Sequence, residues 1–223
     1  MSMKKILKIC MLWTALALPG ILLAAPAKKA NPIKQVSIRL EMVARSPISS
    51  TINNKIQSVR FTNSWLLVFV DYTPGSQAEP QWLDNVNMKV KLLLLPFDKK
   101  ADSQYVIFSG ETTFRQVMAD GRRRTAMMVL PPQFLERYFA KGKKVSLNTH
   151  IIAKAEFTSE SGTALSSPVY YSAAGKTAVQ TTFEKALKNP KTSEKENALL
   201  PRDKSPWRFM NYDQSDLVLD HAK

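Results

Sequence analysis

Cysteine, histidine and glycine are scarce in this sequence of 223 residues, which holds one cysteine, two histidines and seven glycines. The single cysteine, Cys10, lies near the start, so the chain beyond it has no disulfide, no thiolate nucleophile and no zinc-thiolate site. With only His150 and His221, a serine or cysteine triad has almost no base to choose from. These absences argue against most hydrolytic chemistry.

Metal and phosphate motifs are also missing. There is no His-x-x-x-His pair, no acidic loop with its glycine and no glycine-rich phosphate loop. Asp98 and Asp102 lie beside lysines in a polar stretch, where carboxylates are usually solvated. His150 lies in an alternating stretch that places it on a polar strand face. We therefore predict a non-enzymatic protein without a cofactor or a metal.

The first 27 residues have the pattern of a secretory signal peptide. A short basic segment, residues 1–8, precedes an apolar run over residues 9–23, and the small residues AAPA follow. The run is too short for a membrane-spanning helix, which needs about 20 apolar residues. Cleavage after Ala25 and cleavage after Ala27 both stay open. We expect export to the periplasm, the outer membrane or the cell surface, with no integral membrane span in the mature chain.

Basic residues outnumber acidic ones by a wide margin. Removal of residues 1–27 takes away three lysines and no acid, which leaves 29 basic and 18 acidic residues and a net charge of +11. Such an excess favours acidic partners: nucleic acid, an anionic glycan, lipopolysaccharide or a negatively charged membrane. A solvated basic surface without a dedicated ligand has the same charge. Charge alone does not choose among them.

The body of the chain has the alternation of half-buried β-strands. Apolar and polar side chains alternate over residues 36–42 and again over residues 86–94. WLLVFVDY, residues 65–72, is apolar on both faces, which predicts a central strand covered on both sides. Further strands are expected within residues 54–63, 104–118, 124–131, 144–158 and 164–173.

Two segments have helical spacing instead. Residues 131–142 open with two prolines and close with Gly142, which predicts a short helix over one end of the sheets. Residues 177–190 place Val179, Phe183 and Leu187 on one side before Pro190 ends the pattern. No βαβ alternation and no internal repeat occurs. The pattern predicts an all-β, immunoglobulin-like antiparallel β-sandwich of seven or eight strands, with one short helix between strands and a C-terminal helix and tail.

The same patterns divide the chain into four parts. Residues 1–27 are the signal peptide, residues 28–175 the sandwich and residues 176–190 the C-terminal helix. Residues 191–206 are mostly lysine, glutamate, serine and proline, which predicts a mobile linker. We therefore expect residues 191–223 to form a flexible linker with an aromatic tail.

Two basic clusters are candidate anion-binding sites. Asp120-Gly121 suits a tight turn, so the three arginines that follow should begin the returning strand. Alternation would then place Arg122 and Arg124 on one face, able to grip an acidic group, with Arg123 on the other. Equally, charges at a strand start discourage edge-to-edge aggregation. The candidates are Arg122, Arg123 and Arg124 in the first cluster and Lys141, Lys143 and Lys144, after the predicted helix, in the second.

The tail, residues 205–221, is dense in aromatic side chains. Either it folds back and seals the sandwich, for example as an added strand, or it docks on a partner by strand addition. The candidate docking residues are Trp207, Phe209, Met210 and Tyr212.

Four stretches carry a resemblance to a known group of proteins. SVRFTNSWLLVFVDYTPG, WLDNVNMKVKLLLLPFDK, LPPQFLERYF and SSPVYYSA, behind a signal peptide, resemble small exported immunoglobulin-like proteins of type IV pilus-like gene clusters in verrucomicrobial bacteria. The resemblance covers most of residues 35–175. It implies an immunoglobulin-like fold and a role in, or beside, a pilus-like assembly of the cell envelope, with envelope or assembly proteins as partners. No functional residues carry over, because these stretches hold no catalytic or ligand motif.

The chain departs from pilins at its start. Its apolar N-terminal segment has no Gly-Phe-type processing site with a glutamate five residues on. We therefore expect an accessory protein and not a polymerising pilin subunit. The alternative function is a soluble binder of anionic ligands, whether glycan, lipopolysaccharide or nucleic acid.

Overall fold

The computed structural model describes residues 31–43, 64–75, 81–95, 105–138, 150–172, 178–209 and 218–219. The expected signal peptide and the strand expected within residues 54–63 lie outside the described residues. The other predicted strands fall wholly or mostly within these ranges.

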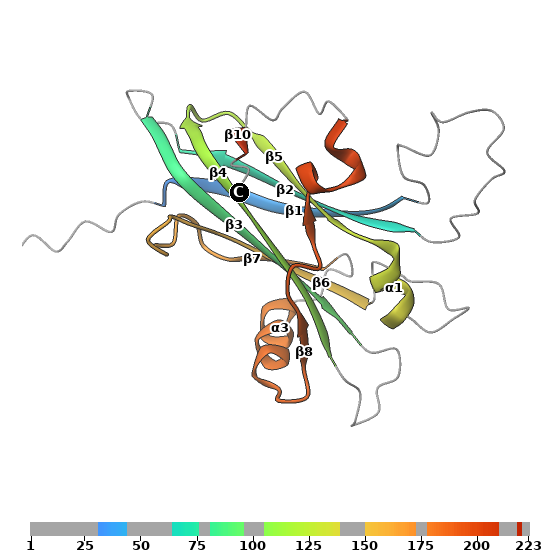
Figure 1. Cartoon of the computed structure of the whole chain (residues 1–223). Coiled ribbons are helices and arrows are strands. Elements are labelled where there is room, and N and C mark those ends of the chain that lie inside the picture. Colours follow the sequence, from blue (N-terminus) through green and yellow to red (C-terminus); the bar gives the residue numbers. More distant parts are fainter. Residues whose placement is uncertain are drawn as a thin grey trace, which may run out of the picture. The chain divides into compact units, whose positions relative to one another are not determined.

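The first sheet contains four strands in the order β1-β2-β5-β9. Strands β1 (Ile33–Val43), β2 (Trp65–Pro74) and β5 (Arg124–Leu130) are antiparallel neighbours, and the two-residue strand β9 (Leu200–Pro201) pairs with β5. Figure 1 shows β1, β2 and β5 crossing the molecule side by side.

The second sheet is built on a long hairpin of β3 (Gln81–Leu94) and β4 (Val106–Ala119). Strand β6 (Ile151–Thr158) pairs with β3, and β7 (Val169–Tyr171) pairs with β6. On its other edge, β4 pairs with two short C-terminal strands, β8 and β10. They are Ser193–Lys195, which is parallel to β4, and Val218–Leu219, which is antiparallel.

The order of the strands is that of an immunoglobulin-like domain. The first sheet holds β1-β2-β5 and the second holds β4-β3-β6-β7. This distribution of seven consecutive strands corresponds to the A-B-E and C′-C-F-G sheets of immunoglobulin domains. The predicted β-sandwich is confirmed, and three short strands from the C-terminal segment extend its sheets.

Strand β2 lies at the centre of the core, as its two-faced apolar pattern predicts. Leu66, Val68 and Val70 belong to the core between the sheets and are fully buried, and Tyr72 continues this row. Leu67 and Phe69 point the other way and are buried against a second cluster on the outer face of the first sheet. Burial on both faces explains why this strand has no alternation.

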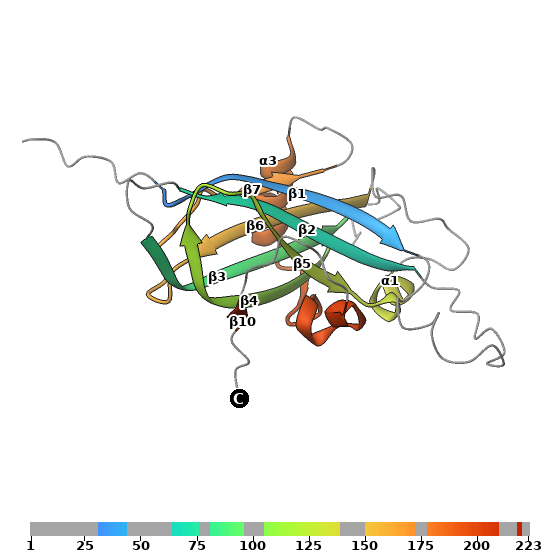
Figure 2. The ribbon, with the colours of Figure 1, turned by 90° about the horizontal axis from the view of Figure 1, so that it is seen from above.

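Both predicted helices are present. Helix α1 (Pro132–Tyr138) begins at the second proline of the pair that suggested it, and its Leu135 joins the core. Helix α3 (Val179–Lys188) packs on the outer face of the second sheet, where Phe183 and Ala186 are buried. α3 and the 3-10 turns near residue 206 lie on opposite sides of the sandwich in both views (Figures 1 and 2).

Residues 193–209 differ from the mobile linker expected there. They form β8, β9 and two 3-10 turns, η3 (Arg202–Lys204) and η4 (Pro206–Phe209), and we call them the C-terminal strap. Ala198, Leu199 and Trp207 of the strap are buried. A polar composition is compatible with this order, because the exposed edges of β4 and β5 accept the backbone of the strap and a few apolar anchors suffice.

Candidate functional site

The turn between β4 and β5 has the predicted geometry. Gly121 has a φ of +74°, and the backbone N–H of Arg122 donates to Oδ1 of Asp120 at 3.0 Å. A side-chain oxygen that accepts from the backbone two residues on stabilises a tight turn. Strand β5 begins at Arg124, as the strand predicted over residues 124–131 implies, and not at Arg122 as suggested for the arginine cluster.

Arg124 turns into the protein and not toward an external ligand. Its side chain is 5% exposed, and Nη2 donates to Oδ2 of Asp120 at 3.0 Å. Arg122, by contrast, is 83% exposed, with Nε 3.8 Å from the same carboxylate oxygen. The expectation that Arg122 and Arg124 share an outward face is wrong, because Arg122 precedes the strand and the alternation does not reach it.

The two arginines hold Asp120 in its charged form. Burial raises the pKa of Asp120, but the hydrogen bond from the Arg122 backbone and the charge of Arg124 outweigh burial, and the net shift is downward. The net pKa shift is upward for Tyr72, which pairs with Arg124 between β2 and β5. Burial raises the pKa of the Tyr72 hydroxyl, and the charge of Arg124 opposes this only in part.

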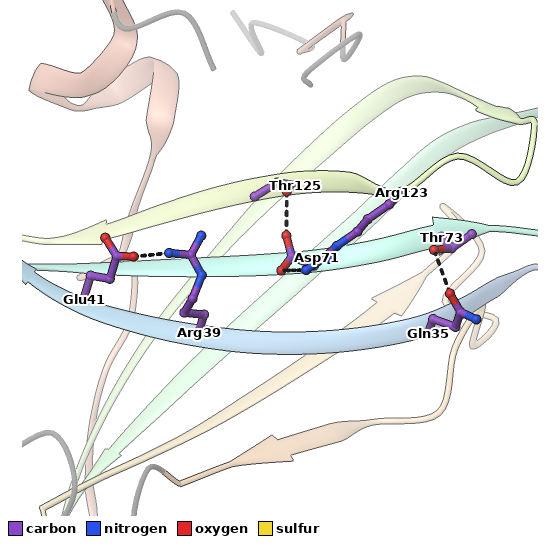
Figure 3. Close-up of polar contacts among 7 residues, drawn as sticks. All are labelled: Gln35, Arg39, Glu41, Asp71, Thr73, Arg123 and Thr125. Carbon is purple, nitrogen blue, oxygen red and sulfur yellow. Dashed lines mark hydrogen bonds and ion pairs between the residues drawn. The ribbon is translucent and has the colours of Figure 1, made fainter. Parts of the chain in front are cut away.

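Arg123 forms an ion pair with Asp71 on the outer face of the first sheet. Its Nη2 lies 2.6 Å from Oδ2 of Asp71, and the Thr125 hydroxyl donates to Oδ1 at 2.5 Å (Figure 3). The side chain of Asp71 is 8% exposed and that of Arg123 is 67% exposed. We call these three residues and Arg39 the Asp71 network.

Electrostatics in the Asp71 network favour the carboxylate. Burial raises the pKa of Asp71, but the hydrogen bonds from Thr125 and Arg123 and the charges of Arg123 and Arg39 together lower it below its ordinary value. Arg39 lies over the ring of Phe69, with Cζ 4.3 Å from the ring centroid, and pairs with Glu41 (Figure 3). The network is thus largely neutralised within the protein, while Arg39 and Arg123 keep exposed guanidinium surface.

An apolar cluster continues this face beyond Phe69. Its buried members are Leu67, Phe69, Met127, Val129 and Trp207, with Val43 and Trp65 packed against them. Trp207 comes from the C-terminal strap and is 3% exposed. Of the two roles proposed for the aromatic tail, Trp207 therefore has the sealing one.

The side chains of the other candidate residues, in the tail and in the lysine cluster, lie outside the described residues. Phe209 ends η4, but its side chain lies outside the described residues, as do Met210 and Tyr212. The short strand β10, farther along the tail, pairs with β4, so this part of the tail adds a strand. The lysine candidates Lys141, Lys143 and Lys144 lie outside the described residues.

Trp82 is a candidate that the sequence reasoning missed. Its side chain is 53% exposed, and it is the one large hydrophobic residue so exposed within the described ranges. The alternation that begins at Val86 would point Trp82 into the core. Asn85, however, has a φ of +48°, and the alternation shifts by one residue there. Side chains at even positions face the core after Asn85, whereas Leu83, at an odd position, packs on the core before it. An asparagine in a strand, which tolerates this left-handed conformation, was the available signal.

The edge of β3 beside Trp82 lacks a second strand among the residues that the structure describes. Strand β4 pairs with β3 along its length, but β6 pairs only with Asn87–Leu94. The first part of β3, residues 81–86, therefore extends past β6, as Figure 1 shows. One contact reaches it from the turn after β6, where Asn85 Nδ2 donates to Oε2 of Glu160 at 2.6 Å.

Within the described ranges, no group of three or more histidine, cysteine, aspartate or glutamate side chains is arranged to hold a metal ion. None of the helices in these ranges combines the length and the apolar character needed to cross a membrane.

Comparisons with known proteins agree with this architecture. A protein-family model matches residues 27–219. A crystal structure of a protein from Akkermansia muciniphila, a verrucomicrobial bacterium, has a TM-score of 0.57 at 16% sequence identity, over 86% of this chain and 96% of that chain. A sporulation control protein from Bacillus subtilis has a TM-score of 0.30 at 11% identity, over 69% of this chain and 54% of that chain. No curated protein matches significantly.

At 16% identity, the likeness to the Akkermansia muciniphila structure shows the fold alone. That structure comes from a verrucomicrobial bacterium, the group named by the resemblance, whereas the pilus-like role stays a prediction. Because the family match spans more than half of the chain, this protein belongs to the matched family.

Proposed function

We propose that this protein is a non-enzymatic component of the cell envelope that binds protein partners, in or beside a pilus-like assembly. The observation that carries the proposal is the exposed Trp82 beside the part of the β3 edge that no described strand pairs. An exposed aromatic next to such backbone donors and acceptors suits strand addition by an extended partner segment. The expected signal peptide supports the envelope location.

The state of the arginines favours this function over capture of anions. Arg123 and Arg124 each form an ion pair with an acid of the same chain, Asp71 and Asp120 respectively. A ligand that took either arginine would have to compete with a carboxylate already in place. We therefore infer a mainly structural role for Arg123 and Arg124, through internal ion pairs and not through the protection against edge-to-edge aggregation suggested from the sequence.

Binding of an anionic ligand remains the second candidate. Arg122, Arg123 and Arg39 keep 83%, 67% and 52% of their side-chain surface exposed, respectively. The mature chain also carries its large basic excess. An anionic glycan, lipopolysaccharide or nucleic acid would meet these groups by long-range attraction more than by fixed geometry.

Capture from envelope extracts at rising salt separates the two functions. The mature chain is immobilised, and envelope proteins and anionic polymers that bind are measured at ionic strengths from low to well above physiological. Contacts made through Trp82 and backbone pairing should persist, because they do not depend on unscreened charge. If envelope proteins are not captured above physiological salt, and heparin or DNA binds at low salt and is released as salt rises, the anionic ligand is favoured and the proposal is overturned.

A further inference from the structure

We propose that the C-terminal strap is exchangeable between copies of this chain, so that the groove it fills can take the strap of a second copy. This inference rests on the proposed assembly function and names the partner as the protein itself. The groove lies between the outer edges of β4 and β5, where the strap crosses from the second sheet to the first.

The walls of this groove come from parts of the chain that precede the strap. On the β4 side, the Ser193 N–H donates to the Tyr105 carbonyl at 3.0 Å, and the Leu199 N–H donates to the Ser109 carbonyl at 3.2 Å. On the β5 side, Leu200 pairs with Val129. The strap thus completes both sheets without supplying any of their seven main strands.

The groove is shaped for the strap at Gly110. A Cβ added to Gly110 would lie 2.2 Å from the Leu199 carbonyl oxygen and 2.6 Å from Leu199 Cβ, so only glycine leaves room for the strap backbone. Leu199 itself is 1% exposed and belongs to the core between the sheets. Complementarity this close identifies the strap sequence as the occupant that the groove fits.

The attachment of the strap is divided into small parts. Strand β8 contributes three residue pairs and β9 two, and Leu199 and Trp207 are the large buried side chains along it. An ion pair between Lys91 and Glu194, at 2.7 Å, adds one polar contact. Beyond the strap, β10 pairs with β4 at two more positions and would leave together with it. A segment held by a few separate anchors can leave its site without unfolding the sheets.

A short hinge separates the strap from an element that stays in place. Helix α3 is held on its own sheet by the buried Phe183 and by Glu184, which accepts a hydrogen bond from the Tyr170 hydroxyl. Asn189, which follows α3, has extended backbone angles because Pro190 comes next. Straightening the hinge at residues 189–192 would keep these angles at Asn189. It would break the turn held by the hydrogen bonds that Lys191 and Thr192 donate to Asn189 and Ala186, and it would direct the strap to a neighbour.

A second copy is the partner that these contacts fit. Its strap has the same residues in the same order, so every backbone pair, the fit at Gly110 and the Lys91–Glu194 contact can form between copies as they form within one. Exchange of an identical element needs no new complementary surface. Reciprocal exchange would give a closed dimer, whereas donation from one copy to the next would give a chain of subunits.

Disulfide trapping with the full chain tests this inference. Val106 and Ser193 are paired in register between β4 and β8, and adjacent strands lie about 4.8 Å apart, within the range that a disulfide spans. Two single variants, Val106→Cys and Ser193→Cys, are made in a Cys10→Ser background, mixed, held just below the melting transition and oxidised. The control mixture pairs Ser193→Cys with Thr113→Cys, which lies exposed on β4 away from that register.

Exchange predicts a disulfide-linked heterodimer from the first mixture, in excess over the control on the order of tenfold, because the groove raises the local concentration of the strap. The double variant Val106→Cys/Ser193→Cys, oxidised when dilute and well below the melting transition, before exchange takes place, should instead close within one chain. A double variant that closes internally while the mixture yields no more dimer than the control would overturn the inference.

The same double variant separates this inference from the proposed function. Once oxidised, its strap is fixed, and it is used for capture from envelope extracts. Capture that persists without heterodimer trapping would leave the envelope function standing and remove only the exchange. Heterodimer trapping without any capture of envelope proteins would support the exchange and remove the proposed envelope function.

Discussion

Trp207 packs edge-on against Trp65, with the ring centroids 5.1 Å apart and the ring planes at 69°. The two rings are far apart in the sequence and lie on the outer face of the first sheet, away from the core between the sheets. This pair fixes the far end of the C-terminal strap. The T-shaped arrangement adds to area burial by about 0.5–1.5 kcal/mol in such pairs.

The first prediction concerns this anchor. Trp207→Ala should lower the free energy of unfolding by about 3–5 kcal/mol, the usual cost of truncating a buried aromatic residue. Thermal or urea unfolding measures the change. Lys204→Ala, in the exposed part of the same strap, is the matched control and should change stability little. Equal stability of Trp207→Ala and the natural chain would mean that the tryptophan does not seal this face.

The second prediction concerns Gly110. Gly110→Ala should push the strap off β4, because the added methyl group would overlap the Leu199 backbone. Limited proteolysis should then cut within residues 193–209, while the sandwich persists. Gly162→Ala is the control: its φ is +79° and nothing lies within 4 Å of the added atom, so it should cost backbone strain without releasing the strap. A strap that resists protease in Gly110→Ala would contradict the fit described for Gly110.

The main sandwich was predictable because its strands bury one or both faces in a regular way. The alternation of residues 86–94 and the continuous run of residues 65–72 determine which side chains reach the core. The strap was not predictable in this way. Its anchors Leu199 and Trp207 are isolated among polar residues. Leu199 is buried in the core beside β4, and Trp207 is buried on the outer face of the first sheet, so both depend on strands that are distant in the sequence.

The third prediction concerns pH. The pKa of Asp71 is lower folded than its ordinary value of 3.8. Its stabilisation is therefore complete above that value and is lost as the pH falls through the lower folded pKa. Asp71→Asn should cost about 1–3 kcal/mol at neutral pH, since it weakens hydrogen bonds to a charged group. Unfolding curves between about pH 5 and pH 2 should then fall less steeply for the variant.

Glu111→Gln is the control for this pH dependence, because Glu111 is exposed on the other sheet. Its acid unfolding should follow that of the natural chain. If Asp71→Asn loses stability in acid as steeply as the natural chain does, the Asp71 network does not contribute to the acid transition.

The fourth prediction concerns the centre of the core. Val68 is fully buried between the sheets, so Val68→Asp should prevent folding, because the charge would have no partner there and its burial costs several kcal/mol. Val68→Ala retains an apolar side chain and should fold with reduced stability. A soluble Val68→Asp variant with a cooperative melting transition like that of the natural chain would disprove the position of β2.

The candidate site was less accessible to sequence reasoning than the fold. Three consecutive arginines indicated a basic cluster, but Arg124 is buried against Asp120 and Arg123 is paired with Asp71. Asp71, the partner of Arg123, lies in a strand read only as apolar. Long-range pairing of this kind leaves no periodic trace in either segment.

The last prediction concerns Trp82 and tests the partner surface directly. Trp82→Ser should leave the melting temperature nearly unchanged, because a side chain that is 53% exposed contributes little to the core. It should, however, reduce the capture of envelope proteins by at least about tenfold, as expected for an aromatic anchor worth about 2 kcal/mol or more at an interface. Arg122→Gln removes an exposed charge from the neighbouring turn and should leave capture at physiological salt unchanged. If Arg122→Gln abolishes capture and Trp82→Ser does not, the binding surface is the basic cluster and not the edge of β3.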